Sequence, residues 1–290
     1  MRPHFFIAGL TLSLLGTATA AYLGHHVDWT LAALFVSSII LIQLSGQVAN
    51  EYADMDEDAR NDNRTLFSGG TGVLAHGTIS KRLAGFIAIV LGASGLLMTA
   101  LITVFCGVNV VIPLLSVLGL AGAYAYSLPP LRLSHTPFGT PLVAFMIGFM
   151  LPVASFIVQT GSWDWYIAVV TLPVTLQVWV FSMAVELPDY DTDLASGRKN
   201  MVTRLGRSWS YVVLTGVTAA GAMVTILGFV LDIPSPIALS MISIFLVESV
   251  VLASAQVRVV RHSHYQALLA LEAAFVLVMA GLSSALLVGI

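Results

Sequence analysis

Long apolar runs recur from one end of this chain to the other, and they restrict its fold more than any other feature. The chain has 290 residues, of which 58% are hydrophobic and 9% are charged, and its mean hydropathy is +0.93. A helix of about 20 apolar residues crosses a bilayer, and inside lipid a helix satisfies its own backbone hydrogen bonds. We therefore expect an all-α, polytopic membrane protein in which about nine transmembrane helices form a bundle. The expected spans are residues 5–24, 28–50, 83–105, 108–126, 138–159, 165–186, 209–231, 235–256 and 265–288.

The positions of the basic residues give an independent test of this topology. Lys and Arg in short loops are retained on the cytoplasmic side of a membrane, and all 12 fall on one side of the nine-span arrangement. We therefore expect an integral, multi-pass protein whose N-terminus and polar loops face the cytosol and whose C-terminus lies on the opposite side. The basic residues are Arg2, Arg60, Arg64, Lys81, Arg82, Arg132, Arg198, Lys199, Arg204, Arg207, Arg258 and Arg261.

Two acidic clusters, residues 50–58 and 186–193, follow the second and the sixth expected spans. They hold more than half of the chain's 15 acidic residues. Because the same feature recurs four helices later, we expect one domain that contains two related four-helix units and a ninth helix, with cytosolic loops over the bundle. The domain is expected at residues 1–290, the units at 5–126 and 138–256, and the ninth helix at 265–288.

Carboxylates packed this densely repel one another unless a cation binds between them. Mg²⁺ prefers oxygen ligands and commonly bridges one or two carboxylates to the phosphates of a substrate. In a membrane protein, the pattern therefore favours an enzyme that acts on a lipid diphosphate. The alternative for either cluster is simple solvation of a helix end that leaves the membrane.

Each cluster continues a polar stripe on an apolar span. Polar groups at membrane depth are costly unless they face the bundle interior or a wet cavity, so each stripe is interpreted as one wall of a pocket. Pro188 is expected to break or kink the second helix. The stripes are Gln43, Gln47, Asn50, Glu51, Asp54 and Asp58, and Gln177, Ser182, Glu186, Asp189 and Asp193.

Composition excludes several other classes of protein. The single cysteine, Cys106, excludes an internal disulfide and a cysteine metal site. A net charge of -3 indicates no nucleic-acid partner, and no obligate protein partner is evident. Glu248 and Glu272 lie inside expected spans away from the clusters, where packing or a lateral opening explains them as well as chemistry does.

At the two clusters the chain resembles a known family. The segment N-E-x-x-D-x-x-x-D at residues 50–58 is similar to the N-D-x-x-D-x-x-x-D signature of the UbiA superfamily of intramembrane prenyltransferases, and D-x-x-x-D at residues 189–193 resembles its second aspartate motif. Flanking segments resemble the menaquinone-type, 1,4-dihydroxy-2-naphthoate polyprenyltransferase-like members: N-R-T at 63–65 with S-G-G at 68–70, Y-S-L-P-P-L-R at 126–132, G-R-K at 197–199 and R-L-G at 204–206.

This resemblance implies a prenyltransferase that binds a polyprenyl diphosphate and an aromatic acceptor within the lipid bilayer. It implies Mg²⁺ as the cofactor, with catalytic aspartates that also bind the metal. The implied metal ligands are Asn50, Asp54, Asp58, Asp189 and Asp193, of which the four aspartates are catalytic. The implied substrate-binding residues are Asn50, Arg64, Tyr126, Arg132, Arg198 and Lys199, although Arg132 is equally explained as a topology-setting charge and Tyr126 as an interfacial residue.

The resemblance favours a 1,4-dihydroxy-2-naphthoate-like acceptor in quinone biosynthesis, because residues 63–65 are typical of that branch. Other acceptors of the superfamily stay open: 4-hydroxybenzoate, a tetrapyrrole or a glycerophosphate lipid, or cyclisation of the prenyl chain without an acceptor. Glu51 replaces the usual aspartate, and Glu186 stands where many menaquinone-type members have asparagine. Outside the superfamily, the alternatives are a secondary transporter and a non-catalytic lipid-binding protein.

Overall fold

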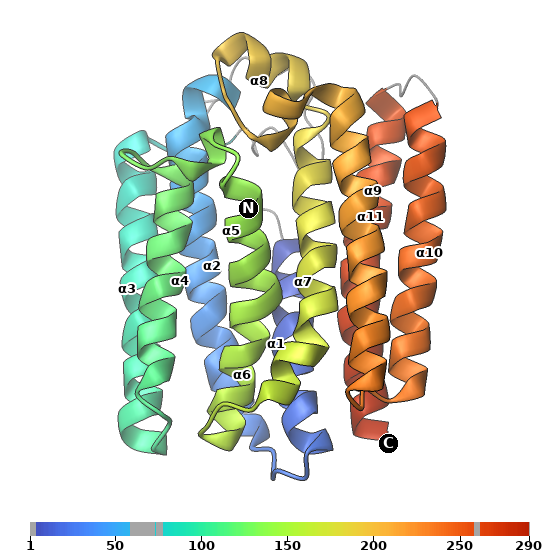
Figure 1. Ribbon diagram of the computed structural model, residues 1–290. Coiled ribbons are helices and arrows are strands. Elements are labelled where there is room, and N and C mark those ends of the chain that lie inside the picture. The colour runs from blue at the N-terminus through green and yellow to red at the C-terminus, as the bar shows by residue number, and fades with distance from the viewer. Residues whose placement is uncertain (1–3, 59–72, 74–77, 258–261, 290) are drawn as a thin grey trace.

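The protein is a bundle of long, roughly parallel helices with a small helical cap at one end (Figure 1). The computed structural model describes residues 4–58, 73, 78–257 and 262–289, and every regular element in these ranges is a helix. This confirms the predicted all-α class.

Seven helices are long and apolar enough to cross a membrane, and two further apolar helices are shorter. In the described ranges, these seven long and two shorter apolar helices lie at the nine predicted positions. The two shorter ones are α1 (His4–Tyr22) and α4 (Val111–Ser127). The others are α2 (Trp29–Asp58), α3 (Lys81–Cys106), the continuous helix of α5 (Gly139–Val143), η2 (Ala144–Met150) and α6 (Leu151–Thr160), α7 (Trp165–Glu186), α9 (Met201–Val230), α10 (Ser235–Val257) and α11 (His262–Gly289). The division into two four-helix units stays a prediction.

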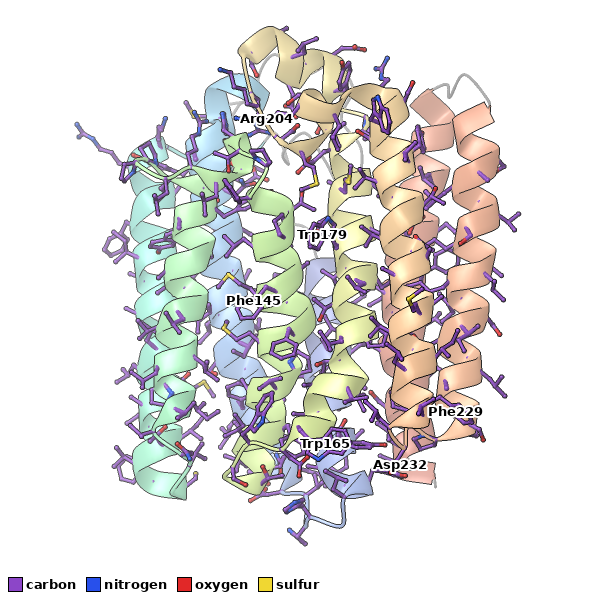
Figure 2. The ribbon with its side chains drawn as sticks, in the orientation of Figure 1. Phe145, Trp165, Trp179, Arg204, Phe229 and Asp232 are labelled. Atoms are coloured by element: carbon purple, nitrogen blue, oxygen red, sulfur yellow. The ribbon has the colours of Figure 1, made fainter. Side chains whose placement is uncertain are left out.

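The outer surface of the bundle is apolar, as a lipid-facing surface requires. Large hydrophobic side chains project from several helices, and Phe145 and Phe229 are 51% and 52% exposed (Figure 2). Charged Arg204 lies at the cap end, and Asp232 lies at the opposite end (Figure 2). These two charged residues thus lie at the ends of the bundle, which fits a multi-pass membrane protein.

The short turn predicted between the third and fourth spans is present. Gly107 ends α3 in the left-handed conformation, with φ of 69°, which glycine adopts without a steric penalty. The side chain of Asn109 then accepts a hydrogen bond from the backbone N–H of Val111 at the start of α4. Its amide nitrogen also donates to the carbonyl of Gly161, which ties this turn to the end of α6.

Two helices differ from the predicted spans. The fifth contains a π-helical stretch, Ala144–Met150, that hydropathy cannot reveal because it depends on hydrogen-bond register. The seventh begins at Met201, eight residues before the predicted residue 209, and Gly206 interrupts it with φ of 75°. The first turn before Gly206 is part of the cap and not of the apolar span, so hydropathy did not predict it as helical.

Small residues let neighbouring helices approach closely. One buried face of α3 carries Ala84, Ala88, Gly92 and Gly95, and this helix packs along α2. A methyl group on Gly95 would lie 2.9 Å from the carbonyl oxygen of Ser38 on α2. Such contacts are the usual basis of helix association in membranes, where small side chains allow backbones to meet.

Gly16 is the position where an added methyl group should cost most stability. On α1, that group would collide with the carbonyl oxygen of Pro152 and lie 2.9 Å from the backbone nitrogen of Phe156, and neither backbone atom moves easily. We expect Gly16→Ala to lower the thermal denaturation midpoint in detergent by about 3–10 °C. Gly216→Ala is the matched control, because nothing lies within 4 Å of the added group and alanine favours a helix. An equal fall in both variants would contradict the close approach of α1 and α6.

The cap brings three polar segments over one end of the bundle (Figure 1). They are η1 (Leu133–His135) after α4, α8 (Tyr190–Ser196) after α7, and the first turn of α9. The C-terminal end of α11 lies at the opposite end of the bundle (Figure 1). The cap therefore surrounds the C-terminal ends of α2 and α7, where the two acidic motifs lie.

Candidate active site

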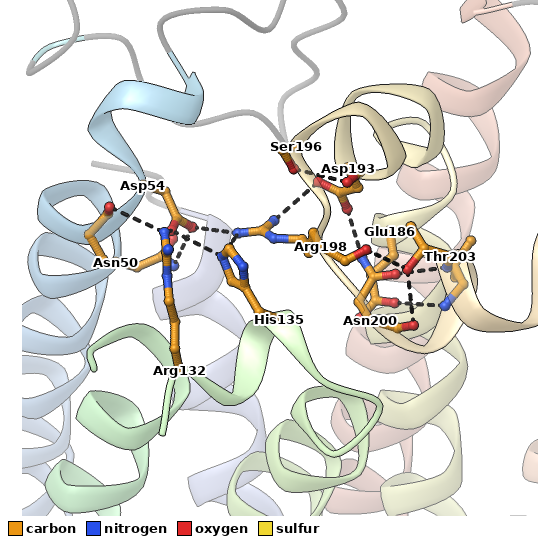
Figure 3. A network of polar contacts seen from close by, with 12 residues as sticks. Asn50, Asp54, Arg132, His135, Glu186, Asp193, Ser196, Arg198, Asn200 and Thr203 are labelled. Atoms are coloured by element: carbon orange, nitrogen blue, oxygen red, sulfur yellow. Dashed lines mark hydrogen bonds and ion pairs between the residues drawn. The ribbon is translucent and has the colours of Figure 1, made fainter. Parts of the chain in front are cut away.

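Asp54, near the C-terminal end of α2, is the centre of a polar network (Figure 3). The residue is 7% exposed. Asn50, one turn earlier, donates from Nδ2 to Asp54 Oδ2 over 3.2 Å. Arg132 donates from Nη2 to Oδ1 over 3.1 Å, and Arg198 donates from Nη2 to Oδ2 over 3.0 Å. Two guanidinium groups from distant parts of the chain thus pair with one largely buried carboxylate.

The second aspartate motif begins where α7 ends. The break predicted at Pro188 is present, because α7 stops at Glu186 and the short helix α8 starts at Tyr190. Asp189 and Asp193 are buried, at 9% and 6% exposure. The backbone N–H of Asp193 donates to the carbonyl oxygen of Asp189 over 2.8 Å, so both carboxylates belong to one helical turn.

Arg198 joins the two motifs. Gly197 ends α8 in the left-handed conformation, with φ of 78°, and this turn directs the next residue back toward the bundle. Arg198 Nη1 lies 3.4 Å from Asp193 Oδ1, while Nη2 of the same side chain lies 3.0 Å from Asp54 Oδ2. The two acidic motifs therefore meet through the guanidinium group of Arg198, which lies between Asp54 and Asp193.

Two further residues of this network were not singled out in the sequence. His135 Nε2 lies 3.1 Å from Arg198 Nη2 and 4.0 Å from Asp54 Oδ1. Asn200 donates from Nδ2 to Asp193 Oδ2 over 2.7 Å, and its Oδ1 caps the start of α9. Both had a weak signal, since His135 follows Arg132 by three residues and Asn200 follows the G-R-K segment directly.

The other predicted site residues have different placements. Tyr126 lines the cavity described below. Lys199 is exposed, and its backbone N–H donates to the carbonyl of His135. Arg64 and the side chain of Asp58 lie outside the described residues. Of the predicted site residues, Asn50, Arg132 and Arg198 contact Asp54, and Arg198 also contacts Asp193.

The donor set suits a hard metal ion that is shared with a substrate. In the described part of the chain, no group of three or more His, Cys, Asp and Glu side chains is arranged to hold a metal ion. Mg²⁺ does not require such a group, because it uses one or two carboxylates and completes its coordination with phosphate oxygens and water. Asp54 on α2 and Asp189 and Asp193 at α8 are the carboxylates that could supply oxygen donors for that arrangement.

A cavity of about 850 Å³ extends from the network into the bundle. Its wall includes Asn50 and Glu186 near the cap and Leu12, Phe35 and Leu115 deeper between the helices. Because Asn50 and Phe35 are 15 residues apart on α2, the cavity follows this helix for about 22 Å at 1.5 Å per residue. Gln43, Gln47, Asn50 and Glu51 all line it, which confirms the predicted polar wall on α2 for these four residues; Asp54 does not line the cavity.

The predicted polar wall on α7 was only half right. Ser182 and Glu186 line the cavity, but Gln177 is buried elsewhere and donates to Glu248 Oε1 over 2.5 Å and to Glu272 Oε2 over 3.4 Å. Gln177 lies two and a half turns before Glu186 at about 3.6 residues per turn. It therefore faces the opposite side of α7, where it connects this helix to α10 and α11.

Comparison with known proteins identifies the family. A model of the UbiA prenyltransferase family matches residues 10–271, which is most of the chain. The chain belongs to the UbiA prenyltransferase family. It is accordingly an enzyme of the class that transfers alkyl groups other than methyl, and the family resemblance read from the two aspartate motifs is confirmed.

Relatives of this UbiA-family protein are distant in sequence and close in fold. The 1,4-dihydroxy-2-naphthoate octaprenyltransferase of Bacillus subtilis is 24% identical over 230 residues, which cover 79% of this chain and 72% of that protein. The structure of a UbiA homologue from Archaeoglobus fulgidus bound to GPP and Mg²⁺ has a TM-score of 0.75 at 17% identity, covering 100% of this chain and 98% of the other. The apo structure of a UbiA homologue from Aeropyrum pernix K1 has a TM-score of 0.74 at 19% identity, with coverage of 99% and 98%.

Proposed function

We propose that this UbiA-family protein transfers a polyprenyl group from an isoprenoid diphosphate to a small aromatic acceptor in a Mg²⁺-dependent reaction. One observation carries the proposal: Arg198 joins Asp54 and Asp193, and Asn50, which donates to Asp54, lines a long, mainly apolar cavity. The charged end suits a diphosphate, and the cavity suits the hydrocarbon chain attached to it. The solved relative whose description names bound GPP and Mg²⁺ has the same fold.

The residues of the site divide the work of the reaction. Arg132 and Arg198 donate to phosphate oxygens, a role that suits the planar, always charged guanidinium group. The C–O bond between the allylic carbon and the diphosphate breaks, and the diphosphate leaves with the bonding electrons. A ring carbon of the acceptor attacks the resulting prenyl cation to form a C–C bond, and that carbon then loses its proton, or its carboxylate as carbon dioxide, which restores the aromatic ring. The apolar cavity wall limits the access of water to this cation, and the ring of Tyr126 stabilises its charge.

The proposed metal ligands lie in both motifs. They are Asn50, Asp54, Asp58, Asp189 and Asp193. When bound there, Mg²⁺ supplies Lewis-acid stabilisation of the charge that develops on the departing diphosphate. Arg64 and Lys199 add positive charge on the same side and complete the proposed substrate-binding set with Asn50, Tyr126, Arg132 and Arg198.

For the acceptor, we favour a 1,4-dihydroxy-2-naphthoate-like compound and a place in quinone biosynthesis, specifically menaquinone biosynthesis. The Bacillus subtilis relative carries that activity in its name, and residues 63–65 resemble the same branch. The same diphosphate site would also serve 4-hydroxybenzoate, a tetrapyrrole, a glycerophosphate lipid, or intramolecular cyclisation. Family membership favours any of these over the secondary transporter.

We also propose that the cap and the N-terminus face the cytosol and that the C-terminus lies on the other side of the bilayer. The basis is the position of the 12 basic residues. In the fold, the cap and the C-terminal end of α11 lie at opposite ends of the bundle, as this orientation requires (Figure 1).

A turnover assay tests the reaction. Purified protein in detergent is supplied with donors of several chain lengths, including geranylgeranyl diphosphate, and a panel of aromatic acceptors. We expect a prenylated product whose formation falls by about 10²-fold or more with EDTA and returns with excess Mg²⁺, because the departing charge then lacks a counter-charge. Diphosphate release without a prenylated product would indicate cyclisation of the prenyl chain, or an acceptor outside the panel, in place of transfer to the tested acceptors. No release from any donor by folded protein would refute the proposal.

A further inference from the structure

Glu186, the last residue of α7, is a carboxylate held in the cavity wall. Thr140 on α5 donates from Oγ1 to Glu186 Oε1 over 2.8 Å, and the backbone N–H of Val202 on α9 donates to Oε2 over 3.3 Å. The side chain is therefore fixed by two separate elements. Each carboxylate oxygen accepts about two hydrogen bonds, so the two bonds to described residues leave part of its accepting capacity for a further donor.

The surroundings of Glu186 differ from those of the aspartates. Asp54 and Asp193 pair with arginines, whereas the hydrogen bonds that Glu186 makes to described residues come from a hydroxyl and a backbone N–H. A diphosphate offers no hydrogen to this carboxylate when ionised, and its charge repels it. A further hydrogen-bond donor to this carboxylate would therefore come from a different ligand.

The cavity around Glu186 has the composition of a site for a hydroxylated ring. Tyr126 and Ser127 of α4, Thr140 of α5 and Ser182 of α7 line the same cavity. Apolar residues such as Met146 and Phe181 complete the wall. An apolar pocket with a few fixed polar groups is the usual arrangement for binding and orienting a small molecule.

We propose that Glu186 binds the acceptor: its carboxylate accepts a hydrogen bond from a hydroxyl group of the aromatic ring and holds that ring beside Tyr126. The inference rests on the proposed function and adds the basis of acceptor choice. A carboxylate in the cavity wall favours an acceptor ring whose hydroxyl group can donate a hydrogen bond to it. It disfavours a ring without that hydrogen, because the buried carboxylate then loses its partner.

Equilibrium binding of two matched probes tests this inference without turnover. The probes are 1,4-dihydroxy-2-naphthoate and its 1,4-dimethoxy analogue, which keeps the ring and the carboxylate but has no hydroxyl hydrogen. Binding is measured from the fluorescence of the protein in detergent. We expect the wild-type protein to bind the dihydroxy probe at least about tenfold more tightly than the dimethoxy probe, because one hydrogen bond to a charged group changes a dissociation constant by about this factor.

Glu186→Gln should weaken binding of the dihydroxy probe by about tenfold and leave binding of the dimethoxy probe within about threefold, because a neutral amide accepts a weaker bond. Thr140→Val keeps the charge of Glu186 but removes the hydrogen bond from Thr140. It should also reduce the preference for the dihydroxy probe over the dimethoxy probe, by a smaller factor than Glu186→Gln does. Asp191→Asn is the control, since this exposed carboxylate pairs with Arg207 away from the cavity, and both dissociation constants should stay within about twofold.

The inference is overturned if wild-type protein fails to bind the dihydroxy probe, binds both probes equally, or has the same dissociation constants as Glu186→Gln. A thermal shift caused by geranylgeranyl diphosphate shows that each variant is folded. Failure of the proposed function appears in a different measurement, namely the absence of prenylated product and of diphosphate release. The two failures are therefore distinguishable.

Discussion

Asp54→Asn is expected to reduce prenyl transfer by about 10³-fold or more while the protein stays folded. The substitution keeps the shape of the side chain but removes the charge that pairs with both Arg132 and Arg198. It also removes a proposed ligand of the metal that neutralises the leaving diphosphate, a contribution of several kcal/mol, and about 1.4 kcal/mol changes a rate tenfold. The measurement is kcat/KM for the donor at saturating Mg²⁺.

Asp191→Asn is the matched control for this change. Asp191 lies on α8 two residues before Asp193, but its side chain is 70% exposed and pairs with the exposed Arg207. An exposed ion pair of this kind contributes about 0–1 kcal/mol, so turnover should change by less than about threefold. Near-normal activity of folded Asp54→Asn would remove Asp54 from the mechanism and, with it, the proposed role of the first motif.

Arg198→Gln is expected to lower kcat/KM for the donor by about 10²- to 10³-fold, with a raised KM. Arg198 lies between the carboxylates of Asp54 and Asp193, and its loss leaves two largely buried negative charges without the cation they share. It also removes donors for the phosphate oxygens. Arg198→Lys should be intermediate, because an ammonium group keeps the charge but lacks the planar fork that contacts both aspartates.

Arg207→Gln controls for the loss of a positive charge on the cap, because Arg207 is exposed and pairs with Asp191. It should leave the donor KM within about twofold. In the double variant Asp54→Asn/Arg198→Gln, the loss should be smaller than the product of the two single losses, since the residues act as one unit. A loss in the double variant equal to the product of the two single losses would show that Arg198 does not act through Asp54.

The membrane fold was predictable because its determinants are local in the chain. A span is recognised from about 20 consecutive apolar residues, and the basic residues of the loops check the count. In the described residues, the seven helices long enough to cross a membrane and the two shorter apolar ones lie at the nine predicted positions. The register within a helix was less accessible: the π-helical stretch Ala144–Met150 and the break at Gly206 depend on hydrogen bonds and packing that hydropathy does not record.

The candidate site was predictable to the extent that it lies on single helices. Asn50 and Asp54 are one turn apart on α2, so their hydrogen bond follows from helical spacing. The same spacing argument failed for Gln177. The predicted stripe on α7 included this residue, although it lies two and a half turns before Glu186 and therefore faces the opposite side of the helix. Its partners Glu248 and Glu272 lie on two other helices, so no local pattern could reveal them.

The sequence by itself determined the helical membrane class, the positions of the apolar helices and the family, because apolar length and the two aspartate motifs are properties of short segments. Only the tertiary structure decided that Arg132, His135 and Arg198 meet at Asp54 and that Thr140 holds Glu186 against the cavity. These contacts join residues that are tens to more than a hundred positions apart. Their formation depends on how whole helices pack, which is decided by shape and small-residue contacts along each helix.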